Sequence, residues 1–514
     1  MEMSIFRLIN EEMTFSILLS TIFIFSFFFL VRWLEPSTKN LPPSPPKLPL
    51  IGNLHQLGHL PYRSLKTLAE KYGPIMLLHL GSKPTLIISS PEMAESVLKT
   101  HDLNFSSRPE PNFVRKITYN YQDILFAPYG EYWRQARSIC VHQLLSNKRV
   151  QSFRSIREEE VASVLENITE SCSSRSPVNV TDILTMLTYN IMSRVAIGRR
   201  LSGNKVGNKF KKLSDEFLEI IGCFDVSDYI PWLWWINKLN GLEGKVDRVA
   251  KEFDEYIETI IEQAEKKREE NFINDDHQQR MHNFIDVLLD FQEKNDTGFV
   301  LQRDAIKAII IDMFIAGTDT ISTLVESAIL ELLKSKSAMT RLKNEVRGLR
   351  DSKSNRITED DLENLPYLAA VIKETCRLHP PAPMLPPRKS KDSINIMGYD
   401  IPAGTQVFIN VFAIGMDSSV WENVDKFQPE RFLDSSIDLK GKHFELIPFG
   451  SGRRSCPGTV FGLITTQLTL ANLILDFNFA IPSGARLVDV EMSEVRSLTI
   501  RRKMALILEA SLAN

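Results

Sequence analysis

The chain has 514 residues, 43% of them apolar, so it can bury a sizeable core in one very large domain or two to three ordinary ones. Its 61 lysines and arginines nearly balance 64 aspartates and glutamates, and no long basic run occurs, which gives no support for a nucleic-acid partner. The 5 cysteines are an odd number without a CxxC pair, which argues against a disulfide framework.

The first feature along the chain is an uncharged apolar run over residues 14–31, about the minimum length for one membrane span. It ends in VRWLEP without a small-residue cleavage site, which favours an anchor over a cleaved signal peptide. Basic residues follow the run, whereas acidic residues outnumber the single basic one before it, so the positive-inside tendency places the rest of the chain in the cytosol. We expect a single-pass anchor over residues 1–34 in a reducing compartment.

Residues 35–58 form the next predicted segment, a stiff spacer with prolines at positions 42, 43, 45, 46 and 49. The rest, 59–514, reads as one mainly helical body with a small β part and no internal repeat. Strand-like pieces occur at 75–81, 85–90, 394–401 and 405–411, and helices are expected over 251–270 and 304–334. The polar, charge-rich segment 271–298 is expected to be a mobile loop.

The predicted helix 304–334 is apolar nearly all round its middle, so we expect it to be buried. Within it lies Ala316-Gly317-Thr318-Asp319-Thr320. A glycine inside a helix costs about 1 kcal/mol relative to alanine, which indicates a close approach or a local distortion. An adjacent acid and alcohol in apolar surroundings are costly without partners, so these residues are candidates for chemistry. The alternative is a solvated helix face.

A helix is also predicted from about Pro366 to Pro380-Pro381. It carries Glu374 and Arg377, which are neighbours on one face because they lie three residues apart. Taken alone, such a pair is more often an exposed salt bridge.

The segment PFGSGRRSCPG, residues 448–458, places Cys456 just before an apolar helix, where peptide dipoles favour a thiolate. Its glycines would let the backbone turn tightly and approach a flat object. The nearest histidine in sequence, His443, is 13 residues away, so a zinc site lacks ligands, and no partner thiol is near. Two readings stay open from these residues: a buried packing cysteine, or the single thiolate bond to a haem iron.

The pattern Phe449-x-x-Gly452-x-Arg454-x-Cys456-x-Gly458 resembles the cysteine-loop signature of the cytochrome P-450 family, the haem-thiolate monooxygenases. Four further motifs match in the family's order: WRQAR at 133–137, AGTDT at 316–320, KETCR at 373–377 and FQPERF at 427–432. The resemblance spans nearly the whole chain. Segments 41–58, 129–140 and 143–150 resemble the plant microsomal branch of specialised metabolism, whose members act on furanocoumarin precursors, terpenoids and indole alkaloids.

The resemblance implies a mainly α cytochrome P-450 fold, one large haem domain behind the N-terminal transmembrane helix, and residue roles as follows. Cys456 would bind the iron of haem b, Phe449 would contact the haem, and its propionates would be reached by Trp133, Arg137, Arg388 and Arg454. Thr320 would hold the hydrogen-bond network of bound dioxygen, and Asp319 would relay protons. A buried structural cluster would consist of Glu374, Arg377 and Arg431.

The implied reaction uses dioxygen and two electrons from NADPH, delivered by a separate flavoprotein reductase at the endoplasmic reticulum membrane. The chain shows no GxGxxG or flavin segment, which agrees with an external donor. The implied substrate pocket comprises segments 109–128, 210–240, 309–320, 382–386 and 495–498, with candidate residues Ala316, Gly317, Ala382, Leu385 and Arg496. Many relatives have Phe-Gly or Ser-Gly where this chain has Arg496-Ser497. Our hypothesis is that Arg496 points inward and favours an acidic or strongly polar substrate; the alternative is a solvent-facing arginine.

Two rival functions remain. One is a haem-thiolate isomerase or dehydratase that needs no dioxygen, against which the presence of both Asp319 and Thr320 argues. The other is a membrane-tethered binding protein on a catalytically dead haem fold, which would predict loss of Cys456 or of the Thr320 region. Both are intact.

Overall fold

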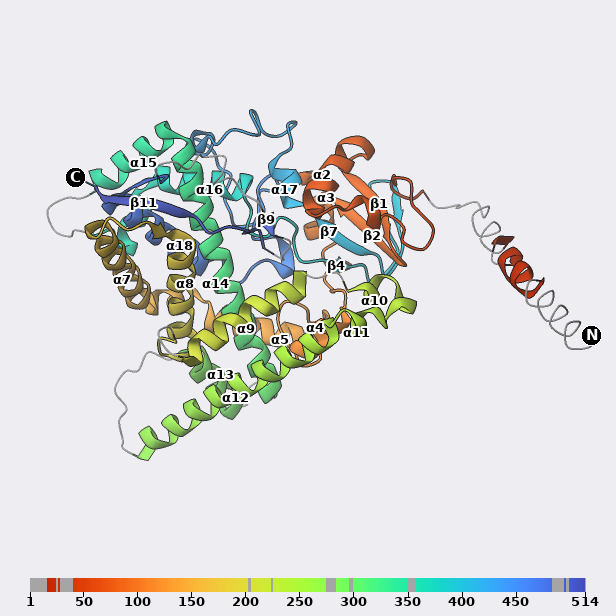
Figure 1. Ribbon diagram of the computed structural model, residues 1–514, viewed down its shortest axis with the longest axis horizontal. Helices are drawn as coiled ribbons and strands as arrows, with labels where there is room; N and C mark the ends of the chain where they lie inside the picture. The colour runs from red at the N-terminus through yellow and green to blue at the C-terminus, as the bar shows by residue number, and fades with distance from the viewer. Residues whose placement is uncertain are drawn as a thin grey trace, which may run out of the picture. The chain divides into compact units, whose positions relative to one another are not determined.

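The computed structural model describes residues 16–24, 26–27, 40–201, 205–222, 225–273, 283–294, 299–349, 356–482, 494–495 and 499–513. Helices predominate, as expected (Figure 1). The helices are α2 (Pro61–Tyr72), α3 (Pro91–Glu95), α4 (Asn112–Ile117), α5 (Glu131–Ile139), α6 (Asn147–Ser152), α7 (Arg154–Ser173), α8 (Val180–Ile197), α9 (Lys205–Gly222), α10 (Val226–Tyr229), α11 (Ile236–Leu239), α12 (Leu242–Ile273), α13 (Phe284–Lys294), α14 (Arg303–Lys334), α15 (Lys336–Gly348), α16 (Pro366–Leu378), α17 (Val411–Gly415) and α18 (Thr459–Asp476). The strands are β1 (Ile75–Leu80), β2 (Lys83–Ile88), β3 (Val178–Asn179), β4 (Arg388–Lys389), β5 (Ile394–Ile396), β6 (Tyr399–Ile401), β7 (Gln406–Ile409), β8 (Phe477–Ala480), β9 (Glu494–Val495), β10 (Arg501–Arg502) and β11 (Ile507–Leu512).

Helix α14 forms the centre of the main unit, which comprises residues 43–393 and 402–514. Figure 1 shows it running among α8, α16 and α18, and it packs against all three. Its apolar residues lie on every side, so almost the whole helix is buried, as the sequence predicts. Among described helices of 18 or more residues, α14 and α18 are long and apolar enough to cross a membrane, but 72% and 61% of their most apolar windows are buried in the protein. Both are therefore core helices.

The β part consists of small sheets. The largest has the strand order β1-β2-β7-β4, in which β2 and β7 run parallel and the other pairs antiparallel. The stretch from Pro43 is bonded to this sheet: the Leu77 amide donates to Pro43 O (2.9 Å), and the Asn53 amide donates to His79 O (2.7 Å). β4 matters for the site because it carries Arg388.

A smaller unit comprises residues 1–42 and 394–401. Its strands β5 and β6 form a hairpin whose turn, Met397-Gly398, has positive φ at both residues, so the expected strand over 394–401 is two strands. Asn40 donates its side-chain amide to Gly398 O at 2.8 Å. Residues 16–24 and 26–27 of the expected anchor are helical, and the other residues of the run 14–31 lie outside the described part.

The expectation of a mobile loop over 271–298 was wrong in part. Helix α12 continues to Ile273, and α13 occupies Phe284–Lys294. Phe284, Ile285 and Leu288 are fully buried, so the segment holds an amphipathic helix whose apolar face its polar average composition conceals. The expected helix over 251–270 lies within α12.

Candidate functional site

The cysteine loop, residues 448–458, ends directly before α18, and Cys456 lies three residues before the first residue of that helix. Gly450 and Gly452 have φ of +68° and +71°, which other residues adopt only with strain, so the predicted tight turns are confirmed. A Cβ at Gly452 would collide with the backbone oxygen of Leu98. This glycine therefore allows two segments of the chain to pack closely, rather than allowing the backbone to approach a flat ligand. The Cys456 amide donates to Phe449 O at 2.8 Å and closes the loop.

The Cys456 side chain faces an interior cavity of about 270 Å³. Although much of its surface is accessible, that surface belongs to the cavity, and burial raises the pKa of the thiol. The Gly458 amide, the Thr459 hydroxyl and the Arg137 charge act in the opposite direction. Within the described part of the chain no cluster of three or more His, Cys, Asp or Glu side chains could hold a metal ion. A single cysteine that faces the cavity can serve as the one protein ligand of a metal that brings its other ligands with it.

Helix α14 forms another wall of this cavity through Ala316, Asp319 and Thr320. Ala382 and Leu385 also line it, as expected for the pocket. Gly317 lies instead against α8, because a Cβ there would be 2.5 Å from Met192 Sδ. The glycine thus permits the close α8–α14 crossing. Arg496 lies outside the described residues.

Four guanidinium groups line the cavity: Arg108, Arg137, Arg388 and Arg454. Of these four arginines, only Arg388 forms an ion pair with a described carboxylate, that of Asp102 (3.0 Å). Asp102 also pairs with Arg453 (3.1 Å). Burial, followed by the charge of Arg388, lowers the pKa of Arg454 to about 9. Burial and neighbouring arginines lower the pKa of Arg108 well below its usual value. This excess of buried positive charge fits a group with two carboxylates, as haem has.

Backbone carbonyls hold these arginines in place. Arg454 donates to Ser106 O (2.8 Å) and Ala127 O (2.5 Å), and Arg137 donates to Ser455 O (2.6 Å). Both arginines line the cavity, as does Phe449. The geometry therefore presents preorganised cations beside Cys456.

Trp133 has a different place from the one expected. It is not among the described residues that line the cavity, and its indole N–H donates to Ile124 O at 3.0 Å. The Arg454 guanidinium lies over its ring, 4.0 Å from the centroid. A cation over an indole face is attracted to it, so Trp133 positions Arg454.

The acid and the alcohol of AGTDT do not contact each other. Asp319 accepts from Arg501 Nε (2.5 Å) and from the Thr499 hydroxyl, and Arg501 also reaches Asp215 (3.0 Å). The Thr320 hydroxyl donates to Ala316 O (2.7 Å), within its own helix. Both side chains line the cavity, but the carboxylate of Asp319 is bound by Arg501, which lies on strand β10.

Glu374, Arg377 and Arg431 form a buried cluster that joins α16 to the segment 415–431. Glu374 accepts from Arg377 Nε and Nη2, both at 2.8 Å, and from Arg431 Nε at 3.1 Å. Arg377 also donates to the carbonyls of Gly415 (2.7 Å) and Val424 (2.8 Å). The pair that in isolation resembles an exposed salt bridge is therefore fully buried.

Sequence reasoning missed Arg108 and Arg501, and it included Asp312 only within the pocket segment 309–320 without singling it out. Asp312 lines the cavity and accepts from the amides of Ile124 (2.7 Å) and Leu125 (3.1 Å). Burial, then the neighbouring Asp123, raises its pKa well above the usual value. In the sequence, Asp312 stands out as the single acidic residue in the apolar stretch IIIDMFIAG. Nothing local marks Arg108 or Arg501.

Comparison with known proteins agrees with this geometry. The family model for Cytochrome P450 matches residues 42–507. Similar curated proteins include Cytochrome P450 71A4 of Solanum melongena, 50% identical over 91% of both chains. Norfluorocurarine oxidase of a Strychnos species is 47% identical over 97% of this chain and 98% of its own. Tabersonine/lochnericine 19-hydroxylase of Catharanthus roseus is 48% identical over 94% of this chain and 95% of its own.

Solved structures show the same fold. A zebra fish cytochrome P450 with progesterone superposes with a TM-score of 0.74 at 22% identity, covering 88% of this chain and 99% of the other. A zebra fish cytochrome P450 with abiraterone gives a TM-score of 0.73 at 21% identity, covering 88% of this chain and 100% of the other. Proteins of the matching family bind haem through a cysteine thiolate and use NADPH-derived electrons through a reductase. The chain belongs to the cytochrome P450 family and is a plant haem-thiolate monooxygenase.

Proposed function

We propose that this chain is a membrane-anchored enzyme that hydroxylates or oxidatively rearranges a small plant specialised metabolite, with Cys456 as its iron ligand. One observation carries the proposal: Cys456, Thr320 and four arginines without enough carboxylate partners line the same apolar cavity. When bound, haem supplies the activation of dioxygen and the insertion of one oxygen atom into the substrate.

The residues that would hold haem are those that fit its shape and charge. Cys456 would bind the iron, and Phe449 would contact the macrocycle. Arg108, Arg137, Arg388 and Arg454 would donate charge-assisted hydrogen bonds to the carboxylates. Trp133 would act through Arg454 by fixing its guanidinium.

The α14 residues would manage protons. Thr320 can turn its hydroxyl from Ala316 O toward the cavity, where it would donate to or accept from the reacting oxygen. Asp319 is connected through Arg501 to Asp215, whose side chain is 46% exposed. The Arg501 guanidinium keeps its own proton, so this network would hold the Asp319 carboxylate at the cavity wall, where Asp319 would relay protons.

The apolar part of the cavity would bind and orient the substrate. Ile315, Leu324 and Leu385 line it together with Ala316 and Ala382 and leave few polar atoms for bulk water. The relatives named for norfluorocurarine and for tabersonine and lochnericine support an indole alkaloid, and we retain terpenoids and coumarin-type compounds as alternatives.

The anchor, the spacer and the electron donor complete the proposal. The apolar run 14–31 would tether the enzyme to the endoplasmic reticulum membrane with its catalytic body in the cytosol. A separate NADPH-dependent flavoprotein reductase would supply electrons. We propose the boundaries 1–34 for the anchor, 35–58 for the spacer and 59–514 for the catalytic domain.

Reconstitution tests this function. Microsomes with the full chain and a plant reductase are supplied with NADPH, dioxygen enriched in oxygen-18 and a panel of indole alkaloids, terpenoids and coumarins. We expect one substrate class to gain a labelled oxygen atom, or to lose hydrogen through rearrangement, only when NADPH is present. Turnover of the panel that persists without NADPH and dioxygen would favour the isomerase or dehydratase instead.

A further inference from the structure

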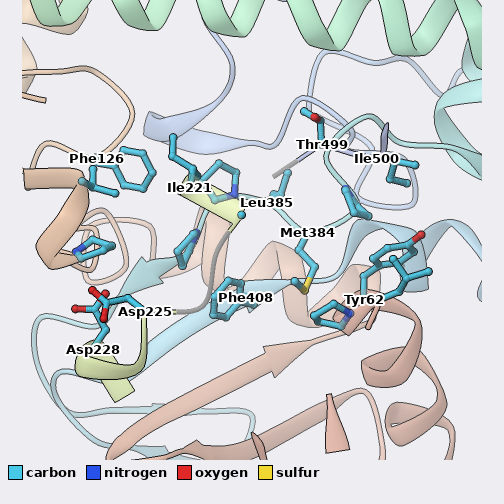
Figure 2. A pocket seen from close by; sticks show the side chains of 18 of the residues that line it. Tyr62, Phe126, Ile221, Asp225, Asp228, Met384, Leu385, Phe408, Thr499 and Ile500 are labelled. Carbon is cyan, nitrogen blue, oxygen red and sulfur yellow. The ribbon is translucent and has the colours of Figure 1, made fainter. Parts of the chain in front are cut away.

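A second cavity adjoins the one that contains Cys456. It measures about 220 Å³ and shares Ile221, Leu385, Pro386 and Thr499 with the first cavity as wall residues. Its middle is apolar, and Figure 2 shows Met384 and Phe408 between Tyr62 at one end and a pair of aspartates at the other. A molecule that occupies this pocket is therefore next to the catalytic cavity.

The charged side chains that line the second cavity are all acidic. Among the described lining residues the ionisable groups are carboxylates and tyrosines, with no lysine, arginine or histidine. The carboxylates are Asp225, Asp228 and Glu494. The guanidinium groups described above line the other cavity. An anion would meet unfavourable charge here, and a cation would meet favourable charge.

Glu494 already has a cation. It accepts from Arg63 Nη2 at 2.9 Å and from the Tyr62 hydroxyl. Burial raises the pKa of Glu494 to about 7, and the Arg63 guanidinium balances its charge when it ionises. The negative charge at this end of the pocket is therefore already balanced by Arg63.

Asp225 and Asp228 form no ion pair with a described cation, although the charge of Lys83 acts on Asp228 and lowers its pKa. Asp225 accepts through Oδ1 from the Ser227 amide (2.8 Å) and from Asn237 Nδ2 (2.5 Å). Asp228 accepts through Oδ1 from the Asn112 amide (3.2 Å). No described group donates to Oδ2 of either carboxylate. Burial, then the charge of Asp225, raises the pKa of Asp228 to about 6, so it is mostly ionised at pH 7.

Helix capping explains only one of these acids. Asp225 is the N-cap of the short helix α10 and is 3% exposed. Asp228 lies in the first turn but bonds to a different element, the start of α4. A second negative charge beside a capped one raises the cost of burying both. The capping role therefore leaves Asp228 without an ion-pair partner among the described residues, with only the weaker effect of the Lys83 charge against it.

We propose that this second cavity binds the substrate through a protonated amine, which donates to Asp228 and Asp225 while the apolar skeleton lies against Met384 and Phe408. A buried ammonium with two carboxylate acceptors forms charge-assisted hydrogen bonds and neutralises the pocket. The proposal rests on the proposed function and names its substrate class: compounds with a basic nitrogen, as opposed to neutral terpenoids or acidic phenolics. The shared wall would direct the carbon skeleton toward the catalytic cavity.

A matched pair of probes tests the proposal on the holoenzyme. N-benzylpiperidine is protonated at pH 7.5, and benzylcyclohexane is its neutral isostere. Equilibrium dialysis gives both dissociation constants for wild type, for Asp228→Asn and for the control Asp392→Asn. Asp228→Asn keeps the acceptor for the Asn112 amide and removes one charge. Asp392 is exposed and bonds only through its backbone in the described structure.

We expect wild type to bind the amine more tightly than the isostere and Asp228→Asn to reduce that preference about tenfold. Asp392→Asn should leave the preference unchanged. Equal affinity of wild type for both probes overturns the proposal even where the variant does not fold, and so does an equal loss of both probes in Asp228→Asn. A normal thiolate spectrum in the same preparations separates this failure from failure of the proposed function.

Discussion

Replacing Glu374 by alanine removes the acceptor that holds the buried cluster together. Its fully buried carboxylate accepts from Arg377 twice, from Arg431 and from the Gln428 amide (2.9 Å). Alanine would leave the Arg377 guanidinium buried without its counter-charge, although the carbonyls of Gly415 and Val424 would still accept from it. Breaking one side of a buried ion pair costs about 3–5 kcal/mol, so we expect about 4 kcal/mol for Glu374→Ala.

The assay is urea unfolding of the haem-loaded protein, followed by far-ultraviolet circular dichroism and by the fraction that binds carbon monoxide. Glu430→Ala is the matched control. Glu430 lies next to Arg431 and accepts from the Tyr367 hydroxyl (2.8 Å) and from Arg341 (3.4 Å), but its side chain is 49% exposed. We expect this variant to lose less than about 2 kcal/mol, because it removes one neutral donor's acceptor and an exposed ion pair. If Glu374→Ala unfolds within about 1 kcal/mol of Glu430→Ala, the buried cluster does not stabilise the fold in the way described.

Three further predictions concern the cysteine loop and the second cavity. Arg454→Leu should weaken haem retention about tenfold after desalting, whereas Arg453→Leu, whose side chain is 52% exposed, should retain it; equal haem content in both would contradict the role of Arg454. Gly452→Ala should lower the thermal midpoint because it combines a φ of +71° with a collision at Leu98 O, and an unchanged midpoint would rule this out. Burial raises the pKa of Asp228 from 3.8 to about 6, so its ionisation destabilises the folded state as pH rises through that window. The stability advantage of Asp228→Asn over wild type should therefore grow between about pH 4 and pH 6 and level off above that; a difference independent of pH would contradict it.

The sequence predicts the helices of the site well because their signals are local. Pro366 and the pair Pro380-Pro381 bound α16, and the unbroken apolar run identifies α14 as a buried helix. The same holds for the loop before α18, whose glycines carry the positive φ values that tight turns require.

Contacts between segments far apart in the chain could not be predicted from local sequence patterns. The burial of Glu374 depends on Arg431, 57 residues further along, and only the family resemblance joined them. Gly317 faces Met192, and Asp319 is held by Arg501; neither partner has a periodic or motif signal. The excess of buried positive charge likewise emerges only after folding brings Arg108 beside Arg454.

The carbon monoxide difference spectrum of the reduced protein tests the central claim most directly, that Cys456 is a thiolate ligand facing the cavity. We predict a band near about 450 nm for wild type and its loss in Cys456→Ser, with Cys376→Ser as a buried-cysteine control that keeps the band. A wild-type protein that binds haem without that band, or a Cys456→Ser variant that retains it, would contradict the account.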